Sequence, residues 1–264
     1  MNEAWLPDVI AEVGLRETST RAVAGLDWAE DGRLAVATSE GACILTPERL
    51  GAELSLRQAW VKTAHDVRAA TWSPTGVAWD GRAALCVVCA ATGRAGVYVP
   101  PRAAHAYEWE KAVVLVLGGR AAASHKSSAA GAADWRDALD QGRGTSNKKR
   151  DRCTVAAWCP VLLGPGGPMI ALGFGGGAVA LRTLTAAELK LEPEDVVLKG
   201  HATATALAWC GRHYICVGDA AGGVHVWRTL GGVCKQWTCR QPDLRCITCI
   251  RAPRFADDAD APFK

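Results

Sequence analysis

Two cysteine pairs in this sequence have the spacing of half a structural zinc site. Two residues separate Cys86 from Cys89, and two separate Cys246 from Cys249. Structural zinc sites place such pairs on turns, where both thiolates converge on one ion. Both pairs lie in apolar runs that predict strands, where residues three apart point to opposite faces of a sheet. We therefore expect buried structural cysteines, with no metal ion and no other cofactor.

Other residues could suggest nucleotide binding or catalysis. The run from Gly173 to Gly177 imitates a phosphate-binding loop, but the apolar residues after it predict a strand, whereas such a loop opens a helix. The six histidines fall in no HExxH pattern, and no serine lies in a nucleophile elbow. No succession of strand, glycine loop and helix offers a site for acetyl-CoA. These patterns predict a protein without catalytic residues.

A short basic run could bind an acidic partner. It consists of Lys148, Lys149, Arg150 and Arg152, and Asp151 interrupts it. One interpretation is a solvated loop, and the other is a nuclear-import signal or a patch that contacts nucleic-acid phosphates. The net charge of the chain is only +3, so composition gives no general case for binding nucleic acids or membranes. Direct contact with nucleic acid would therefore depend on this one loop.

Four segments of the chain repeat one order of features. In each, a tryptophan ends a short apolar strand, and two further apolar strands follow after turns. The segments span residues 25–47, 69–101, 154–184 and 197–230. Trp28 and Trp72 lie 44 residues apart, close to the period of about 40–45 residues in WD repeats. One such unit cannot bury both faces of its sheet, so we expect neighbouring sheets to pack together with the tryptophan rings between them.

Each unit carries turn residues and tryptophans that we expect to be structural. They are Trp28, Asp31 and Gly32 in the first unit, Trp72, Pro74 and Gly76 in the second, Trp158 and Pro160 in the third, and His201, Trp209, Asp219 and Trp227 in the fourth. The fourth unit is most similar to a WD repeat, in which a His, an Asp, a Ser or Thr and the last Trp commonly form a hydrogen-bonded network. Here Cys210-Gly211-Arg212 replaces the turn that would carry the Asp, which argues against that network.

The whole pattern predicts an all-β fold, namely a WD-type β-propeller present in part, with about four to five blades. Hydrophobic residues make up 49% of the chain and charged residues 22%, which is typical of a globular domain. The sequence shows no signal peptide or membrane-spanning run, so the eleven cysteines indicate a reducing, intracellular environment. We expect a lead-in at 1–22, blades one and two with a following strand at 23–119, a flexible charged insertion at 120–152, blades three, four and part of a fifth at 153–252, and a disordered tail at 253–264.

The first two units resemble a known family. The sequence GLDWAEDGR at 25–33 is followed by Trp72-Ser73-Pro74, then by Glu108-Trp109-Glu110, a charged insertion and Trp158. This order resembles the N-terminal β-propeller of the transcription factor IIIC delta subunit, and the resemblance covers roughly residues 23–230.

The resemblance implies a nuclear, non-enzymatic assembly subunit. Its partners would be the protein subunits of a complex that supports RNA polymerase III transcription of tRNA and related genes. The family has also been linked to histone acetylation, which makes a histone acetyltransferase-associated subunit one alternative. A generic WD-repeat adaptor of another intracellular complex is a further alternative, and the sequence leaves all three open.

Overall fold

The computed structural model describes residues 25–50, 53–63, 66–102, 107–115, 152–160, 167–184, 196–198, 202–211, 213–229, 234–240 and 245–250. Every regular element in these stretches is a β-strand, which confirms the predicted all-β fold. The predicted lead-in, the predicted tail and the charged insertion apart from Arg152 lie outside the described residues.

The strands form four sheets, here called blades one to four. Blade one contains β1 (Leu26–Trp28), β2 (Leu34–Ala37), β3 (Gly41–Leu50) and β4 (Glu53–Lys62). Blade two contains β5 (Val67–Trp72), β6 (Leu85–Cys89), β7 (Ala95–Val99) and β8 (Glu110–Leu115). Blade three contains β9 (Cys153–Trp158), β10 (Met169–Phe174), β11 (Val179–Thr183) and β12 (Val196–Leu198). Blade four contains β13 (Ala204–Cys210), β14 (Tyr214–Asp219), β15 (Gly223–Arg228) and β16 (Cys234–Arg240).

In each blade, every strand pairs antiparallel with the next strand along the chain. Tight turns connect the strands where the sequence supplies glycine. Gly177 has φ +85° and its N–H donates a 3.0 Å hydrogen bond to the carbonyl of Phe174, between β10 and β11. The glycine run at 173–177 therefore ends β10 and forms the turn to β11 with residues 175–177, as predicted, and opens no helix.

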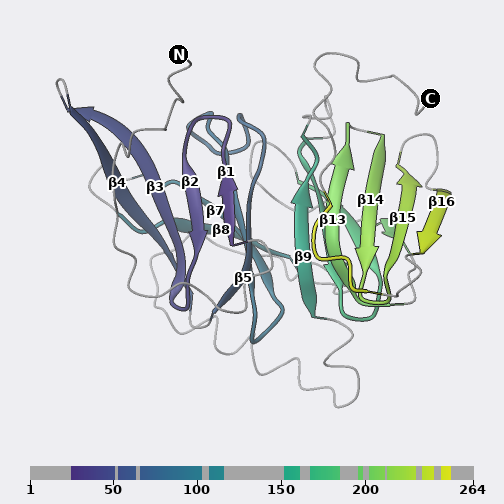
Figure 1. The fold of residues 1–264 in the computed structure, drawn as a ribbon. Coiled ribbons are helices and arrows are strands. Elements are labelled where there is room, and N and C mark those ends of the chain that lie inside the picture. The colour runs from purple at the N-terminus through teal and green to yellow at the C-terminus, as the bar shows by residue number, and fades with distance from the viewer. Residues whose placement is uncertain are drawn as a thin grey trace, which may run out of the picture.

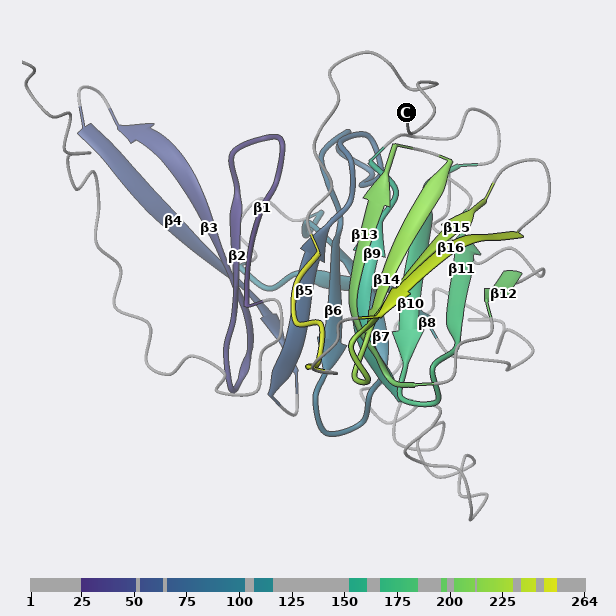
Figure 2. The same ribbon diagram turned by 45° about the vertical axis from the view of Figure 1, so that its right-hand side comes forward.

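The blades follow one another in chain order, from blade one in purple and blue to blade four in green and yellow (Figures 1 and 2). Their first strands lie side by side, because β1 contacts β5, β5 contacts β9, and β9 contacts β13. The hairpin of β3 and β4 is longer than β1 and β2 and extends away from the other blades (Figures 1 and 2).

Both faces of an inner blade are buried. In β6, Leu85 and Val87 belong to the core shared with blade one, whereas Cys86 and Val88 belong to the core shared with blade three. Successive side chains of a strand point to opposite faces, so a strand covered on both sides needs an unbroken apolar run. This position explains why Cys86 is buried, and the burial raises the pKa of its thiol well above the ordinary value.

The segment before β8 joins blade two to the edge of blade one. The N–H of Trp60 in β4 donates to the carbonyl of Tyr107 at 2.8 Å, and the N–H of Trp109 donates to the carbonyl of Trp60 at 2.9 Å. Glu108 forms a parallel bridge with Trp60. The strand predicted to follow within residues 23–119 is present as β8.

Replacing Gly41 should destabilise the fold much more than replacing Gly81. Gly41 begins β3 at φ +151°, and an added Cβ would overlap the carbonyl oxygen of Val61 in β4. We expect Gly41→Ala to lower the free energy of unfolding by roughly 3 kcal/mol or more, since backbone strain and overpacking add. Gly81 has φ +78° but no atom within 4 Å of an added Cβ, so Gly81→Ala should cost only about 1 kcal/mol. Urea unfolding of both variants measures the difference, and equal losses would show that β4 can move away from β3.

Candidate protein-interaction site

Three of the predicted tryptophans lie between successive blades. Trp72 and Trp158 end the first strands of blades two and three, Trp209 is the last residue but one of the first strand of blade four, and the three are only 6%, 6% and 7% exposed. Their indole N–H groups donate to the carbonyls of Asp27, Thr71 and Ala157 at 3.0, 3.2 and 3.0 Å. Each acceptor immediately precedes the tryptophan of the blade before it. One contact is thus repeated at all three blade interfaces.

Trp28 differs from these three. It ends the first strand of blade one at the equivalent position, but it is 63% exposed, and Leu26 two residues earlier is 66% exposed. The expectation that the Trp28 ring packs between two blades is therefore wrong for this position, because the described residues contain no blade before blade one. The other predicted tryptophan, Trp227 in β15, is half-buried and packs against the core shared by blades three and four.

A second contact also repeats from blade to blade. Four residues before the tryptophan, a side chain donates to a carbonyl of the next blade, as Arg68 does to Thr154 at 2.9 Å. In blade four, Thr205 has this position and its hydroxyl donates to the carbonyl of Ile247 at 2.6 Å. The N–H of Ile247 donates to the Asp219 carbonyl at 3.1 Å, as the N–H of Val67 does to Thr38. Ile247 therefore lies where the first strand of a fifth blade would begin.

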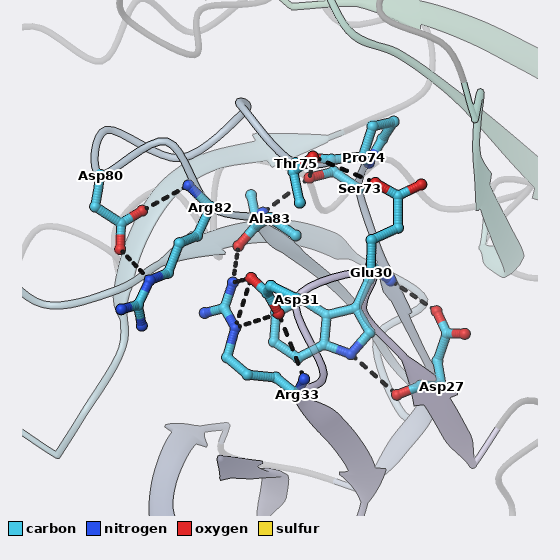
Figure 3. Close-up of polar contacts among 12 residues, drawn as sticks. Asp27, Glu30, Asp31, Arg33, Ser73, Pro74, Thr75, Asp80, Arg82 and Ala83 are labelled. Atoms are coloured by element: carbon cyan, nitrogen blue, oxygen red, sulfur yellow. Dashed lines mark hydrogen bonds and ion pairs between the residues drawn. The ribbon is translucent and has the colours of Figure 1, made fainter. Parts of the chain in front are cut away.

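Arg33 links the turn of blade one to blade two (Figure 3). Its guanidinium pairs with Asp31, with a shortest distance of 2.6 Å, and donates to the carbonyl of Ala83 at 2.9 Å. It also lies over the rings of Trp72 and Trp109, 4.7 and 5.1 Å from their centroids. Burial alone would raise the pKa of Asp31, but the hydrogen bonds and charge of Arg33 outweigh burial and hold that pKa below its usual value.

The Trp72-Ser73-Pro74 turn is held by main-chain and side-chain contacts. The N–H of Trp72 donates to the carboxylate of Asp27 at 2.8 Å, so Asp27 binds both the backbone and the indole of this residue (Figure 3). The Ser73 hydroxyl accepts the N–H of Ala84 at 2.8 Å. Pro74 is buried within this turn, whereas Pro160 after Trp158 is exposed. Gly32 and Gly76 have φ +83° and +90°, conformations that turns favour in glycine.

Asp219 forms a hydrogen-bonded network in blade four, although the sequence favoured the absence of such a network. Its carboxylate accepts the N–H groups of Ala221 and Gly223 at 2.9 and 2.7 Å. Nε2 of His225 lies 2.9 Å from the other carboxylate oxygen, and Nδ1 of His225 lies 3.1 Å from the Thr238 hydroxyl. Burial would raise the pKa of Asp219, but the hydrogen bonds from His225 and the backbone outweigh it and lower that pKa. The expected histidine, His201, lies outside the described residues.

The two cysteine pairs occupy different environments. Cys86 and Cys89 lie in β6 as predicted, whereas Cys246 and Cys249 are exposed in a segment that is not a strand. The prediction that the second pair is buried in a strand is therefore wrong. Within the stretches that the structure describes, no group of three or more His, Cys, Asp or Glu side chains could hold a metal ion.

The predicted basic patch lies mostly outside the described residues. Of its members, only Arg152 is described: its side chain is exposed, and its carbonyl accepts the N–H of Gly175 at 2.9 Å. Lys148, Lys149 and Arg150 lie outside the described stretches. As for membranes, none of the described segments forms a helix long and apolar enough to span a bilayer.

Comparison with known proteins supports the fold. No family model and no curated protein matches this chain in sequence. A chain of the mitotic checkpoint complex is 15% identical with a TM-score of 0.51, and the match covers 84% of this chain and 53% of that one. Sqt1 of Saccharomyces cerevisiae is 9% identical with a TM-score of 0.47, covering 86% and 65%. A chain from the structure of BBS1N in complex with ARL6DN is 14% identical with a TM-score of 0.45, covering 82% and 51%.

The fold is a WD-type β-propeller, present in part. The stacked four-stranded meanders and the match to the checkpoint-complex chain both show it, and the predicted fold class is confirmed. The chain spans between about half and two thirds of the length of the chains that it matches.

The tryptophan contacts predict a graded loss of stability. Trp158→Ala should lower the free energy of unfolding by about 3–5 kcal/mol, because it removes a buried ring and leaves a cavity between two blades. Trp158→Phe keeps most of the apolar volume. In addition to the small cost of the lost volume, it should lower the free energy of unfolding by about 1 kcal/mol, because the Thr71 carbonyl loses its donor. Trp79→Ala is the control, because Trp79 is 51% exposed and donates within its own blade to Pro100. If urea unfolding showed equal losses of stability for Trp79→Ala and Trp158→Ala, the assignment of Trp158 to the core between two blades would be wrong.

Cys210 should react with alkylating reagents near neutral pH. Its Sγ lies 3.8 Å from Sγ of Cys216, and hydrogen bonding from Cys216 lowers the pKa of the Cys210 thiol to about 7. Because the thiolate is the nucleophile, iodoacetamide labelling of Cys210, followed by mass spectrometry, should be half-maximal near pH 7. In Cys216→Ala the pKa should return toward about 8.5, which leaves only about 3% thiolate at pH 7. Buried Cys43, whose pKa is raised to about 11, is the unreactive reference, and an unchanged pH profile in Cys216→Ala would contradict the prediction.

Proposed function

We propose that this chain is a non-enzymatic scaffold on which protein subunits of a larger complex assemble. The observation that carries the proposal is the combination of rigid blade interfaces with aromatic side chains exposed on loops. Trp79 and Tyr107 are 51% and 62% exposed, and each is fixed in place: Trp79 donates to Pro100, and Arg57 lies over the Tyr107 ring at 5.5 Å. Rigid aromatic side chains are enriched where proteins bind one another, because they bury a large area at little entropic cost.

More specifically, we propose a nuclear subunit of the transcription factor IIIC complex that supports RNA polymerase III transcription of tRNA and related genes. The support is the resemblance to the delta subunit, together with the positions of the residues that carry it. Arg33 from the first motif lies over Trp72 from the second and Trp109 from the third. These residues depend on one another physically, which gives a reason for the three motifs to occur together in one sequence.

Two alternative functions have weaker support. A generic WD-repeat adaptor of another intracellular complex would use the same rigid blades and loops with different partners. A histone acetyltransferase-associated subunit is suggested only by the link between the resembled family and histone acetylation. Direct contact with nucleic acid would involve exposed Arg152 and the basic run before it.

Affinity purification of the tagged full chain from nuclear extract tests the proposal. We expect the other transcription factor IIIC subunits to co-purify, and the tagged chain to occupy tRNA genes in chromatin immunoprecipitation. A tagged, unrelated WD propeller is the control for non-specific capture. Partners from a different complex, with no enrichment at tRNA genes, would favour the generic adaptor. Transfer of acetyl groups from acetyl-CoA to histones by the purified chain would contradict a non-enzymatic role.

A further inference from the structure

Two thiols of blade four lie against each other near the end of a hairpin. Cys210 is the last residue of β13 and Cys216 lies in the neighbouring β14, and their Sγ atoms are 3.8 Å apart. Cys210 pairs with Tyr214 and Cys216 pairs with Ala208, so the two cysteines are diagonal neighbours on one face of the sheet. Both are free thiols, and their sulfur atoms are placed to react with one another.

The two thiols differ in accessibility and in protonation. Cys210 is half-buried at the strand end, whereas Cys216 is only 9% exposed. The hydrogen bond between them lowers the pKa of the Cys210 thiol to about 7 and raises the pKa of the Cys216 thiol above its ordinary value. Near neutral pH, Cys210 is therefore a thiolate in a large fraction of the molecules, and Cys216 is a protonated thiol beside it.

The strand end that carries Cys210 is freer to move than the strand that carries Cys216. To form a disulfide, the two sulfur atoms must approach from 3.8 Å to about 2.05 Å. Gly211 follows Cys210 outside β13 and has φ +60°, which places a turn directly after the cysteine. Cys216, by contrast, is paired with Ala208 on one side and Val226 on the other. Rotation of the Cys210 side chain, with a small shift of the turn, can close the gap while β14 stays in place.

Three buried cysteines elsewhere in the blades lack this chemistry. Burial raises the pKa of Cys43 to about 11, that of Cys153 to about 12, and that of Cys86 well above its ordinary value. The thiolate is the form of cysteine that attacks an electrophile, so these three thiols react slowly near neutral pH. Cys210 differs from them in charge, in exposure and in having a second thiol within reach.

We infer that Cys210 is an oxidation site for hydroperoxides, and that Cys216 converts the oxidised side chain to a reversible Cys210–Cys216 disulfide. Low-pKa cysteines beside a resolving cysteine are the usual sites of reversible oxidation in proteins. The inference goes beyond the proposed scaffold function and applies whichever complex the chain belongs to.

The reaction has two steps. The Cys210 thiolate attacks one oxygen of the hydroperoxide, so an S–O bond forms, the O–O bond breaks, and the departing oxygen takes up a proton as water or an alcohol. Sγ of Cys216 then attacks Sγ of the Cys210 sulfenic acid. The S–S bond forms, the S–O bond breaks, and the oxygen leaves as water with the proton of the Cys216 thiol. The two thiols lose two electrons, which reduce the peroxide, and a dithiol reductant reverses the oxidation.

Peptide mapping of the full, unaltered chain tests the inference. The chain is treated with hydrogen peroxide, remaining thiols are blocked with N-ethylmaleimide, and the unreduced protein is digested with trypsin. Cleavage after Arg212 places the two cysteines in separate peptides, 200–212 and 213–228, each with one cysteine. We expect mass spectrometry to find these two peptides linked, and dithiothreitol to release them. Unlinked peptides after peroxide treatment, or a link from Cys210 to any other cysteine, would overturn the inference.

Serine variants separate the roles of the two thiols. Cys216→Ser keeps a hydroxyl donor beside Cys210 but removes the resolving sulfur, so dimedone, which traps sulfenic acids, should label Cys210 more strongly than in the unaltered chain. Cys210→Ser should give neither linked peptides nor dimedone labelling of Cys216. Equal labelling of Cys210 in the Cys216→Ser and unaltered chains would show that Cys216 does not resolve the oxidised side chain.

An exposed cysteine outside the pair provides the matched control. Cys246 is exposed in a segment that is not a strand, and Cys246→Ser should leave the link between peptides 200–212 and 213–228 unchanged. Loss of the link in this variant would show that oxidation begins at Cys246, which would overturn the assignment of Cys210. Thermal melting checks the folding of each variant, and the mapping of the unaltered chain does not depend on any of them.

Discussion

A buried indole N–H needs an acceptor, and at three interfaces of this fold the acceptor is a carbonyl of the preceding blade. One tryptophan therefore fills the space between two sheets and is bonded to a fixed atom of the neighbouring main chain. The ring sets the spacing of the two blades, and the hydrogen bond sets how far one first strand is shifted along the other. Repetition of this contact makes four separate meanders into one stack.

The size of the indole limits what can lie around it. The strands that face the rings carry many small buried side chains, among them Ala35, Ala42, Ala70 and Ala171, all fully buried. Gly173 lets blade four pack closely on blade three, because an added Cβ would lie 2.8 Å from the side chain of Ala204 in blade four. Large rings at strand ends and small residues along the strands are thus two parts of one packing solution.

The tryptophan spacing and the glycine turns were sufficient to predict the all-β stack. The spacing gives the length of the repeat, the glycines mark the turns between strands, and both can be read from short stretches of sequence. The contacts that join the blades were not predictable in the same way. Nothing local indicates that Arg33 reaches two rings from blade two, or that His225 pairs with Asp219. Trp28 shows the limit of repeat reasoning: its sequence context matches the buried tryptophans, but its burial depends on a neighbour that the pattern does not supply.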